Sequence, residues 1–401
     1  MRLALWLGAT LALAGVAFMG IAAIAPRLLQ LMQMPAEYVG WFSGIVWACA
    51  LLSSPLGGTF SQHHDPWRVS QACLVLCALG LMAIAAGQPW LFWLGAVLIG
   101  MGHGLEAPPA SHLLMRYTDD GRRPLVFSLK QSGVQLGAMS ASLLLPILTV
   151  LAGPAPVLVG VAAILLLFAI SMNGARARYP MPVPPHAAMS SEMWREVRAG
   201  FVQWAPQLRR QPAILRLALA SSAFGATQVC MNSFMVTWLV KVRDMDLPQA
   251  GFYAALMQGS GLLARPLWGW VASSTWSPRF VLVLLGTAMA LSALTLAVFG
   301  LRLNGLALPA VLMVFGLSAS GWNGVFMADV AQRSPEGEVS RYTAAAIIPL
   351  FLGLICGPVV FTLLAASGNG FSLAWGALSA MGVIGVLILP GPSEKGSSRA
   401  S

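Results

Sequence analysis

The chain has 401 residues, of which 58% are hydrophobic and only 9% are charged, and its formal net charge is +10. A soluble protein of this size needs many more charged side chains to cover its surface, so the composition excludes an ordinary water-soluble domain. A positive net charge can indicate a nucleic-acid partner. Here the basic residues are distributed as in a membrane topology, so the net charge does not point to nucleic acid.

Apolar runs of about 20 residues, long enough to cross a bilayer as α-helices, divide the chain into twelve predicted spans. In chain order they cover 4–26, 38–59, 69–87, 90–114, 125–149, 155–173, 213–240, 249–271, 280–301, 307–329, 342–366 and 371–390. The first run is longer than the apolar part of a signal peptide, and no cleavage site follows it. We therefore expect a retained helix.

The basic residues predict the orientation of these spans. With an even number of spans both termini lie on one side, and 19 of the 23 Lys and Arg residues then fall toward that side. The residues that fall toward the other side are Arg27, Lys241, Arg243 and Arg302. By the positive-inside rule the termini are cytoplasmic, so the chain is expected to be a multi-pass protein of the inner (plasma) membrane.

The fourth span contains the stretch GMGHGLEAPPASH, which is unusual for a membrane helix. Pro108 and Pro109 lack N–H groups, so they predict a kinked, locally open helix whose free carbonyls face a cavity. His103 and Glu106 are three residues apart on one face and can form a hydrogen bond. We interpret Glu106 as the residue that binds a coupling proton, because a carboxyl group in a low-dielectric environment favours its neutral form. In this interpretation His103 tunes the proton affinity of Glu106 or relays the proton to it. The alternative is that the prolines only shape the helix and Glu106 pairs with a neighbouring group.

The fifth span contains Lys130, about two turns from its cytoplasmic start. Lys130 can extend to the membrane interface, bind an anionic substrate, or form a salt bridge to Glu106. Gln131 points elsewhere and can donate a hydrogen bond to a carboxylate. Arg27, at the outer end of the first span, is either a periplasmic anchor or part of an electrostatic funnel for anions.

Polar residues in the later spans complete the candidate substrate or proton site. The candidates are Gln228, Asn232 and Asn323, although hydrogen bonds between helices are the simpler expectation for the two asparagines. Asp329 and Arg333 are expected to form a structural ion pair. The third, sixth, ninth and twelfth spans are poor in polar residues, apart from hydroxyl groups and end residues such as Gln71 and Asn173. Trp238 and Trp322 are expected to pack in the interior, with stacking on substrate as the alternative.

A stretch rich in proline separates the first six spans from the last six. YPMPVPP (179–185) is expected to be extended, and 190–204 is expected to form an amphipathic helix at the cytoplasmic interface. The predicted division is an N-terminal six-helix bundle (1–178), a cytoplasmic linker with the amphipathic helix (179–212) and a C-terminal six-helix bundle (213–401).

The two halves repeat each other in sequence. When residues 40–68 are shifted by 211 positions, seven of 29 positions are identical, including Pro55 with Pro266 and Arg68 with Arg279. A shift of 216 pairs Gly100 with Gly316 and Gly137 with Gly353. The expected fold is therefore an all-α membrane protein with twelve transmembrane helices in two pseudo-symmetric six-helix bundles around a central cavity.

This layout resembles the major facilitator superfamily of transporters over essentially the whole chain. The family motif G-x-x-x-D-[RK]-x-G-[RK]-[RK] is matched in part by GTFSQHHDPWR and by GWVASSTWSPR. The resemblance assigns a cytoplasmic gate motif to Gly58 and Arg68, and to Gly269 and Arg279. Gln62 and Ser273 stand where the family has an acidic residue, so the sequence departs from the charged gate at those positions.

Two further stretches resemble a group of bacterial facilitators, many of unassigned substrate. They are RRPLVFSLKQSGVQLGA (122–138) and GLSASGWNGVFMADVA (316–331), similar to helices 5 and 10 of that group. Some relatives of this kind are grouped with cyanate-type or nitrate-type anion permeases. The Gly-Pro pair of drug antiporters is missing from helix 5 and occurs instead at Gly357-Pro358 in the eleventh span.

The sequence thus predicts a secondary active transporter of a small organic solute, with a preference for anions, that works by alternating access and is coupled to protons. The alternatives are a drug or metabolite efflux antiporter and, in another class, an integral-membrane enzyme or a channel. No cofactor or metal site is expected, because there is no Walker loop and no cluster of Cys and His ligands. A monomer that binds its substrate, a coupling proton and the surrounding lipid is expected, without nucleic acid.

Overall fold

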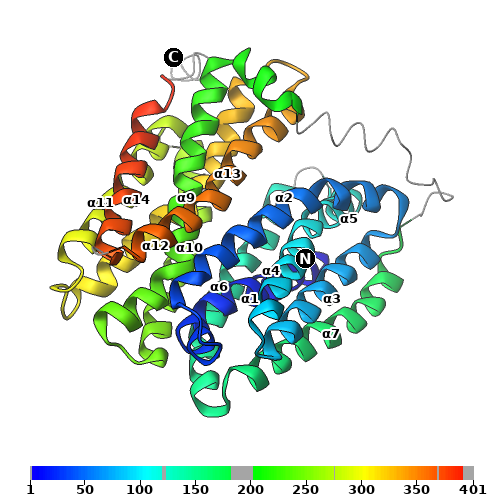
Figure 1. Cartoon of the computed structure of the whole chain (residues 1–401). Helices are drawn as coiled ribbons and strands as arrows, with labels where there is room; N and C mark the ends of the chain where they lie inside the picture. The colour runs from blue at the N-terminus through cyan, green and yellow to red at the C-terminus, as the bar shows by residue number, and fades with distance from the viewer. Residues whose placement is uncertain (1, 120–122, 182–201, 275, 368–369, 392–401) are drawn as a thin grey trace. The chain divides into compact units, whose positions relative to one another are not determined.

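A computed structural model describes residues 2–119, 123–181, 202–274, 276–367 and 370–391 (Figure 1), and within these ranges it contains helices and no strands. The helices before the predicted linker are α1 (Arg2–Leu31), η1 (Ala36–Tyr38), α2 (Val39–His63), α3 (Pro66–Ala85), α4 (Pro89–Leu105), α5 (Ala107–Tyr117), α6 (Arg123–Ala152) and α7 (Pro154–Arg178). After it come α9 (Pro212–Arg243), α10 (Leu247–Ser274), α11 (Pro278–Phe299), α12 (Ala307–Arg333), α13 (Val339–Ala365) and α14 (Gly370–Ile388). The amphipathic helix expected at 190–204 falls almost entirely outside the described residues.

Eleven helical segments in the described ranges are long and apolar enough to cross a membrane. One of them, Pro89–Tyr117, joins α4 and α5, which together correspond to the fourth predicted span. The 28-residue helix α10 is long enough but more polar, and it corresponds to the predicted span 249–271. With α10 included, the helices match the twelve predicted spans one for one, so the predicted all-α membrane fold is confirmed.

The helices group by their contacts into two compact units. Unit 1 consists of Met1–Met193 with Ser233–Ala255, and unit 2 of Trp194–Asn232 with Leu256–Ser401. The second half of α9 and the start of α10 therefore belong to unit 1. There the Lys241 ammonium lies 2.7 Å from Glu37 Oε1, and the hydroxyls of Ser43 and Ser233 are 2.8 Å apart. The division of the chain at a linker over 179–212 stays a prediction.

Glycines bring α6 very close to α1 in unit 1. A side-chain carbon on Gly133 would collide with the carbonyl of Gly8, and one on Gly137 would collide with the carbonyl of Ala12. Membrane helices pack through such small residues because lipid offers no hydrophobic gain for association, and close backbone contact supplies dispersion energy instead. The small residues at 133 and 137 therefore fix the position of α6 on α1.

The same contact recurs in unit 2. A side-chain carbon on Gly353 of α13 would collide with the carbonyl of Ser222 on α9, and one on Gly357 would lie 2.7 Å from Ala226 Cβ. Gly137 and Gly353 are the pair that the 216-residue shift relates. The sequence repeat thus marks equivalent helix contacts inside each unit.

A second helix pair also repeats, through serine hydroxyls. Ser53 on α2 donates to the Met101 carbonyl of α4 at 3.1 Å, and Ser260 on α10 donates to the Met313 carbonyl of α12 at 2.9 Å. Beside these bonds, Gly100 packs on the backbone of α2 and Gly316 on the backbone of α10. Each unit therefore builds its second and fourth spans against each other in the same way.

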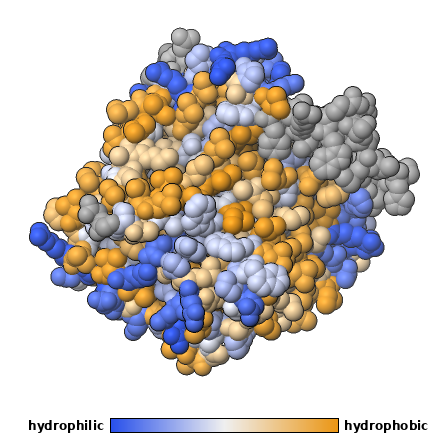
Figure 2. All heavy atoms as spheres, viewed as in Figure 1, coloured by the Kyte–Doolittle hydropathy of each residue, from blue (hydrophilic) through white to orange (hydrophobic). Residues whose placement is uncertain are grey.

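Large apolar side chains remain on the outside of the helices. Figure 2 shows apolar residues over much of the visible surface and hydrophilic residues gathered at its margins. On α7 the exposed residues include Ile164, Leu167 and Ile170, at 55%, 66% and 65% of their full exposure. Water would make such a surface unfavourable, whereas lipid chains are its natural solvent. This protein is accordingly a multi-pass membrane protein.

Candidate functional site

The fourth span is interrupted at Glu106, between the end of α4 and the start of α5. Glu106 keeps helical backbone angles (φ −72°, ψ −43°), and its N–H reaches back only to the His103 carbonyl, at 3.4 Å. Pro108 and Pro109 have no N–H to continue the α-helical hydrogen-bond ladder. The predicted break is confirmed, and it leaves a carboxylate at the point where the two helices meet.

The break is held in place by α2. The backbone of Leu105 packs so closely on Gly57 that a side-chain carbon there would lie 3.1 Å from Leu105 Cα. Gly104 packs directly against Ala50 and Ser53 of the same helix. These contacts position Glu106 from one side, so its location does not depend on the glycines of α4 alone.

Lys130 of α6 forms an ion pair with Glu106. Its Nζ lies 3.0 Å from Glu106 Oε1 and donates a hydrogen bond of 3.1 Å to Oε2. Both residues are buried, with 4% and 3% of their surfaces exposed. Lys130 therefore does not extend to the membrane interface, and of the three alternatives for this residue the structure has the salt bridge.

The backbone of α6 explains how Lys130 reaches this place. It is the eighth residue of α6, so it lies about 10 Å from the helix start at ~1.5 Å per residue. Gly8 of α1 lies against the backbone at Lys130, at 3.7 Å for a carbon built on Gly8. The close α1–α6 contact thus carries the ammonium group to the interior of unit 1.

His103 has aromatic neighbours and is not bonded to Glu106. Its ring centroid is 5.4 Å from that of Trp47, edge to face, and 6.2 Å from that of Phe18. Its Nδ1 is buried without a hydrogen-bond partner among the described residues. The predicted His103–Glu106 hydrogen bond is therefore wrong, because Glu106 stands at the break and its carboxylate is turned to Lys130 on another helix.

Gln131 and Arg27 lie apart from this pair. Gln131 is exposed on α6, and the described residues show no hydrogen bond from it to a carboxylate, so that expectation is not met. The reason is the helical rotation of about 100° between Lys130 and its neighbour. Arg27 is exposed on α1, where its guanidinium donates to Gln30 Oε1 at 3.3 Å.

Two pairs of amide side chains lie on α9 and the helices beside it. Asn323 of α12 donates to Gln228 Oε1 of α9 at 3.1 Å, and Gln258 of α10 donates to Asn232 Oδ1 of α9 at 2.9 Å. All four residues belong to unit 2. Gln228 and Asn232 are one turn apart, so one face of α9 binds two neighbouring helices. The hydrogen bonds expected between helices for Asn232 and Asn323 are confirmed.

Arg265 of α10 is a candidate that the sequence prediction missed. It lies nine residues before the end of α10, about 13 Å from that end. Its Nε is buried without a hydrogen-bond partner among the described residues. The Arg265 side chain is half-buried, and a positive charge inside a membrane helix is costly unless something compensates it, so Arg265 is a further candidate for contact with an anion. Its place inside a helix, rather than in a basic loop, was the available signal.

Other residues from the sequence prediction are structural. Arg333 Nε lies 2.8 Å from Asp329 Oδ1, so the expected ion pair is confirmed. Trp238 and Trp322 are buried, at 2% and 0% exposure, and Trp322 packs on Phe224 and Phe326. Within the described ranges, no group of three or more His, Cys, Asp or Glu side chains is arranged to hold a metal ion.

The gate-motif residues lie at helix ends in both units. Gly58 is in α2 and Gly269 in α10, while Arg68 and Arg279 stand in the first turns of α3 and α11. Arg279 donates to the Pro390 carbonyl at 2.6 Å. The two arginines are thus at matching places, although of the two only Arg279 has a described side-chain hydrogen bond.

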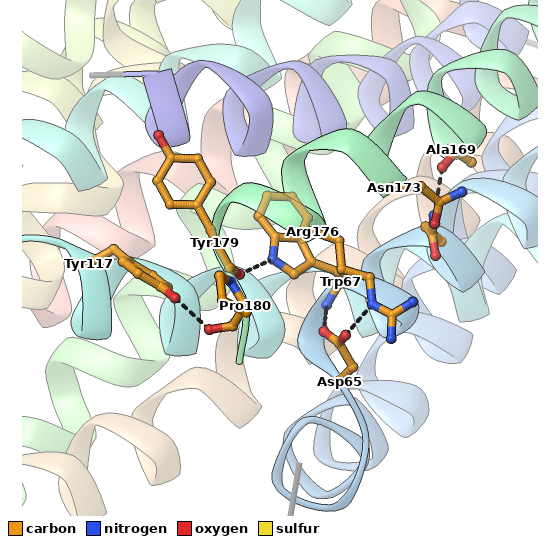
Figure 3. Close-up of polar contacts among 9 residues, drawn as sticks. Asp65, Trp67, Tyr117, Ala169, Asn173, Arg176, Tyr179 and Pro180 are labelled. Carbon is orange, nitrogen blue, oxygen red and sulfur yellow. Dashed lines mark hydrogen bonds and ion pairs between the residues drawn. The ribbon is translucent and has the colours of Figure 1, made fainter. Parts of the chain in front are cut away.

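Asp65, just before α3, is the acidic residue that holds this end of unit 1 together. Its side chain accepts from the Trp67 N–H at 3.0 Å, which caps α3, and it pairs with the Arg176 guanidinium of α7 (Figure 3). The family motif has its aspartate three positions earlier, where Gln62 stands. The sequence does not single out Asp65, because its partner is 111 residues away.

The chain leaving α7 is bound by the same cluster. Trp67 Nε1 donates to the Tyr179 carbonyl at 2.9 Å, and the Tyr117 hydroxyl donates to the Pro180 carbonyl (Figure 3). The rings of Tyr117 and Tyr179 also pack edge to face, with centroids 5.3 Å apart. The start of the expected extended segment is therefore fixed on the ends of α3 and α5.

The sequence matches the family model described as Major Facilitator Superfamily over residues 5–348. The chain belongs to the Major Facilitator Superfamily. It is a membrane transporter, not an enzyme, and a small-molecule substrate follows from that membership. No curated protein sequence matches it.

Solved structures of other facilitators share the fold. The nucleoside transporter NupG, in a variant form, superposes with a TM-score of 0.77 at 15% identity, covering 96% of this chain and 98% of that one. The peptide transporter POT in complex with sulfate gives 0.77 at 15%, covering 97% and 94%. A bacterial homolog of the human lysosomal transporter Spinster gives 0.74 at 14%, covering 97% and 94%. At these identities the likeness extends to the fold alone.

The amide pair between α9 and α12 allows a quantitative test. The double-mutant cycle of Asn323→Ala and Gln228→Ala is expected to show a coupling energy of about 0.6 kcal/mol, and at most about 1.7 kcal/mol, as for other hydrogen bonds between membrane helices. Thermal or denaturant unfolding of the purified protein in detergent provides the measurement. Gln228→Ala with Gln258→Ala is the control, because these side chains are not bonded to each other and should be additive within about 0.5 kcal/mol. Equal coupling in both cycles would contradict the assignment.

Proposed function

We propose that this facilitator is a secondary active transporter of a small organic anion, coupled to protons and working by alternating access in the bacterial inner membrane, with both termini cytoplasmic. The observation that carries the proposal is the buried pair of Glu106 and Lys130, with 3.0 Å between Nζ and Oε1. Ionisable groups inside membrane helices are costly and are retained mainly where they serve transport.

The pair links a proton to an anion by competition. While Glu106 is ionised, its carboxylate forms an ion pair with the ammonium group of Lys130, so that group cannot bind an anion. When Glu106 takes up a proton its charge disappears, and Lys130 is then free to bind a negatively charged substrate group. An anion that binds Lys130 first favours proton uptake by Glu106 in return, since linkage between two sites is reciprocal. One proton thus accompanies one negative charge.

Further residues have roles in this scheme. In unit 2, Arg265 is proposed as a separate candidate for contact with an anionic group, because its Nε has no hydrogen-bond partner among the described residues. Also within unit 2, the amide pairs Gln228–Asn323 and Asn232–Gln258 are proposed as candidates for polar contact with a substrate. In unit 1, His103 lies beside the Trp47 ring near the break. Arg27, exposed on α1, is proposed to attract anions to the outer opening. The structural relatives include a POT transporter bound to sulfate and one bound to 5-aminolevulinic acid, which is consistent with substrates of this size.

Uptake into proteoliposomes tests the proposal. A monovalent anionic substrate, found by ligand-induced thermal stabilisation across a metabolite panel, is expected to accumulate when the lumen is alkaline and to ignore an imposed membrane potential. The reason is that one proton and one negative charge cross the membrane together, so the transport step carries no net charge. Accumulation that is driven only by the potential, requires ATP, or lacks any response to the proton gradient would contradict the coupling. Stimulation by an acidic lumen would instead indicate antiport.

A further inference from the structure

A second polar site lies on the outer surface of unit 1, away from Glu106 and Lys130. An open groove of about 570 Å³ runs between α3 and α7, and its lining includes Arg68, Gln71, Val75, Leu166, Asn173 and Arg176. Its polar residues gather at the end where α3 begins and α7 ends. We propose that this groove binds the headgroup and upper acyl chain of an anionic phospholipid of the phosphatidylglycerol type.

The charge of the groove favours a single phosphate. Arg176 uses its Nε for Asp65, so that pair is neutral overall, while four other N–H groups of its guanidinium stay available. Arg68 is exposed, and its guanidinium has no hydrogen bond or ion pair with any described residue. One positive charge is therefore in excess, which complements the one negative charge of a phosphodiester.

Comparison with unit 2 shows that Arg68 is left unbound by its own fold. Its repeat partner Arg279 bonds the Pro390 carbonyl at 2.6 Å, so that side chain is already used in holding the chain after α14. In unit 1 the equivalent task falls to the Trp67 indole, which bonds the Tyr179 carbonyl. Arg68 is thereby released to the surface beside the groove.

The amides on the groove floor are ordered in a way that suits a phosphate. Gln71 donates both to the Ala169 carbonyl, at 2.8 Å, and to Asn173 Oδ1, at 3.1 Å (Figure 3 labels Ala169 and Asn173). Because the oxygen of Asn173 accepts from Gln71, its NH₂ group stays available as a donor. The polar end of the groove therefore presents donors from one amide and two guanidinium groups.

The apolar wall of the groove extends from its polar end toward the middle of the helices, where the acyl chain of a bound lipid would lie. Val75 lies seven residues after Arg68 on α3, about 10 Å deeper along the helix at ~1.5 Å per residue. Leu166 and Ile170 form the opposite wall on α7. Beyond the groove, Leu79 and Leu167 continue the exposed apolar surface, at 46% and 66% exposure. A free anion would use the arginines but would leave this wall without a partner.

The predicted topology places the polar end of the groove at the membrane surface where anionic lipids are found. The charge distribution of the chain assigns this end of α3 and α7 to the cytoplasm, where the membrane surface is negative because of anionic lipids. Basic residues between helices at that surface are typical of sites for anionic headgroups.

Native mass spectrometry of the full chain in detergent tests the inference, with phosphatidylglycerol and phosphatidylcholine of identical acyl chains as probes. Arg68→Gln is expected to weaken phosphatidylglycerol binding about fivefold, since a basic residue at the surface contributes about 1 kcal/mol. Binding of phosphatidylcholine should not change. Arg178→Gln is the matched control, because it removes an exposed arginine of α7 that does not line the groove. Equal losses in both variants would overturn the proposal.

Two more measurements separate the role of the headgroup from that of the acyl chain. Asn173→Asp keeps an acceptor for Gln71 and adds a negative charge, so it should remove the preference for phosphatidylglycerol while the protein stays monodisperse. Glycerol 1-phosphate, which has the headgroup chemistry without acyl chains, should not displace the lipid at equal concentration. If it displaces the lipid mole for mole, the groove is a site for soluble anions and the lipid proposal is wrong.

Discussion

Glu106→Gln is expected to abolish uptake driven by a proton gradient while it leaves exchange of substrate across the membrane in place. The amide has the shape of the protonated carboxyl group but cannot release a proton, so Lys130 stays without a charged partner and remains open to an anion. Proteoliposomes preloaded with substrate measure exchange, and empty ones with an alkaline lumen measure driven uptake. If driven uptake survives the substitution, Glu106 has a structural role only.

The same substitution should also destabilise the protein. Removing one partner of a buried ion pair leaves the other charge uncompensated, which costs about 3–5 kcal/mol. Lys130 is only 4% exposed and lies about 10 Å from the start of α6, so water relieves little of this cost. Glu106→Gln with Lys130→Met should be more stable than Glu106→Gln alone, because no charge is then left in the interior. A double variant less stable than both single variants would contradict the ion pair.

Asp329→Asn is the matched control for these measurements. Asp329 is a carboxylate with 2% exposure that also pairs with a basic residue, but its partner Arg333 is on the same helix, four residues away at the end of α12. The substitution should lower stability and reduce driven uptake and exchange together. A selective loss of driven uptake in Asp329→Asn would place the proton site in unit 2 and contradict the proposal for Glu106.

Features that depend on residues close in the sequence, such as the helices and the break at Glu106, could be predicted. Contacts between distant residues, such as the partner of Glu106, could not. The helices follow from apolar runs, and the break at Glu106 follows from two prolines that any structure must accommodate. The choice between His103 and Lys130 as partner of Glu106 depends on how α6 packs beside α5, which no spacing rule gives. The helical i,i+3 rule failed because the hydrogen-bond ladder ends at Glu106.

Contacts between charged residues far apart in the sequence do not follow from helical spacing. Asp65 and Arg176 are 111 positions apart, and the sequence alone gives each of them only a place at a helix end. Arg265 counts among the basic residues on the cytoplasmic side because the positive-inside rule uses number and side, not burial. Only the packing around α10 shows that its Nε is enclosed.

Gly137→Leu is expected to prevent stable packing of α1 on α6. A side-chain carbon at this position would collide with the carbonyl of Ala12, and a backbone carbonyl cannot move aside as a flexible side chain can. Overpacking of a core usually costs about 1–3 kcal/mol, and a collision with backbone should exceed that range. Size-exclusion chromatography and thermal unfolding in detergent should show aggregated or strongly destabilised protein. Gly353→Leu should behave alike in unit 2, since Gly353 meets the Ser222 carbonyl.

Gly160→Leu separates this effect from the loss of a glycine as such. Gly160 is in the first half of α7, and a side-chain carbon there would meet nothing within 4 Å. Its helix faces lipid, so an added leucine gains a suitable environment and improves helix propensity, because glycine in a helix interior is less favourable by about 1 kcal/mol. Unchanged or higher stability is therefore expected. Gly8 and Gly133 belong to the same close α1–α6 contact, which places Lys130 beside Glu106. If Gly137→Leu is tolerated, that contact is not as close as described, and the explanation for the position of the Glu106–Lys130 pair is wrong as well.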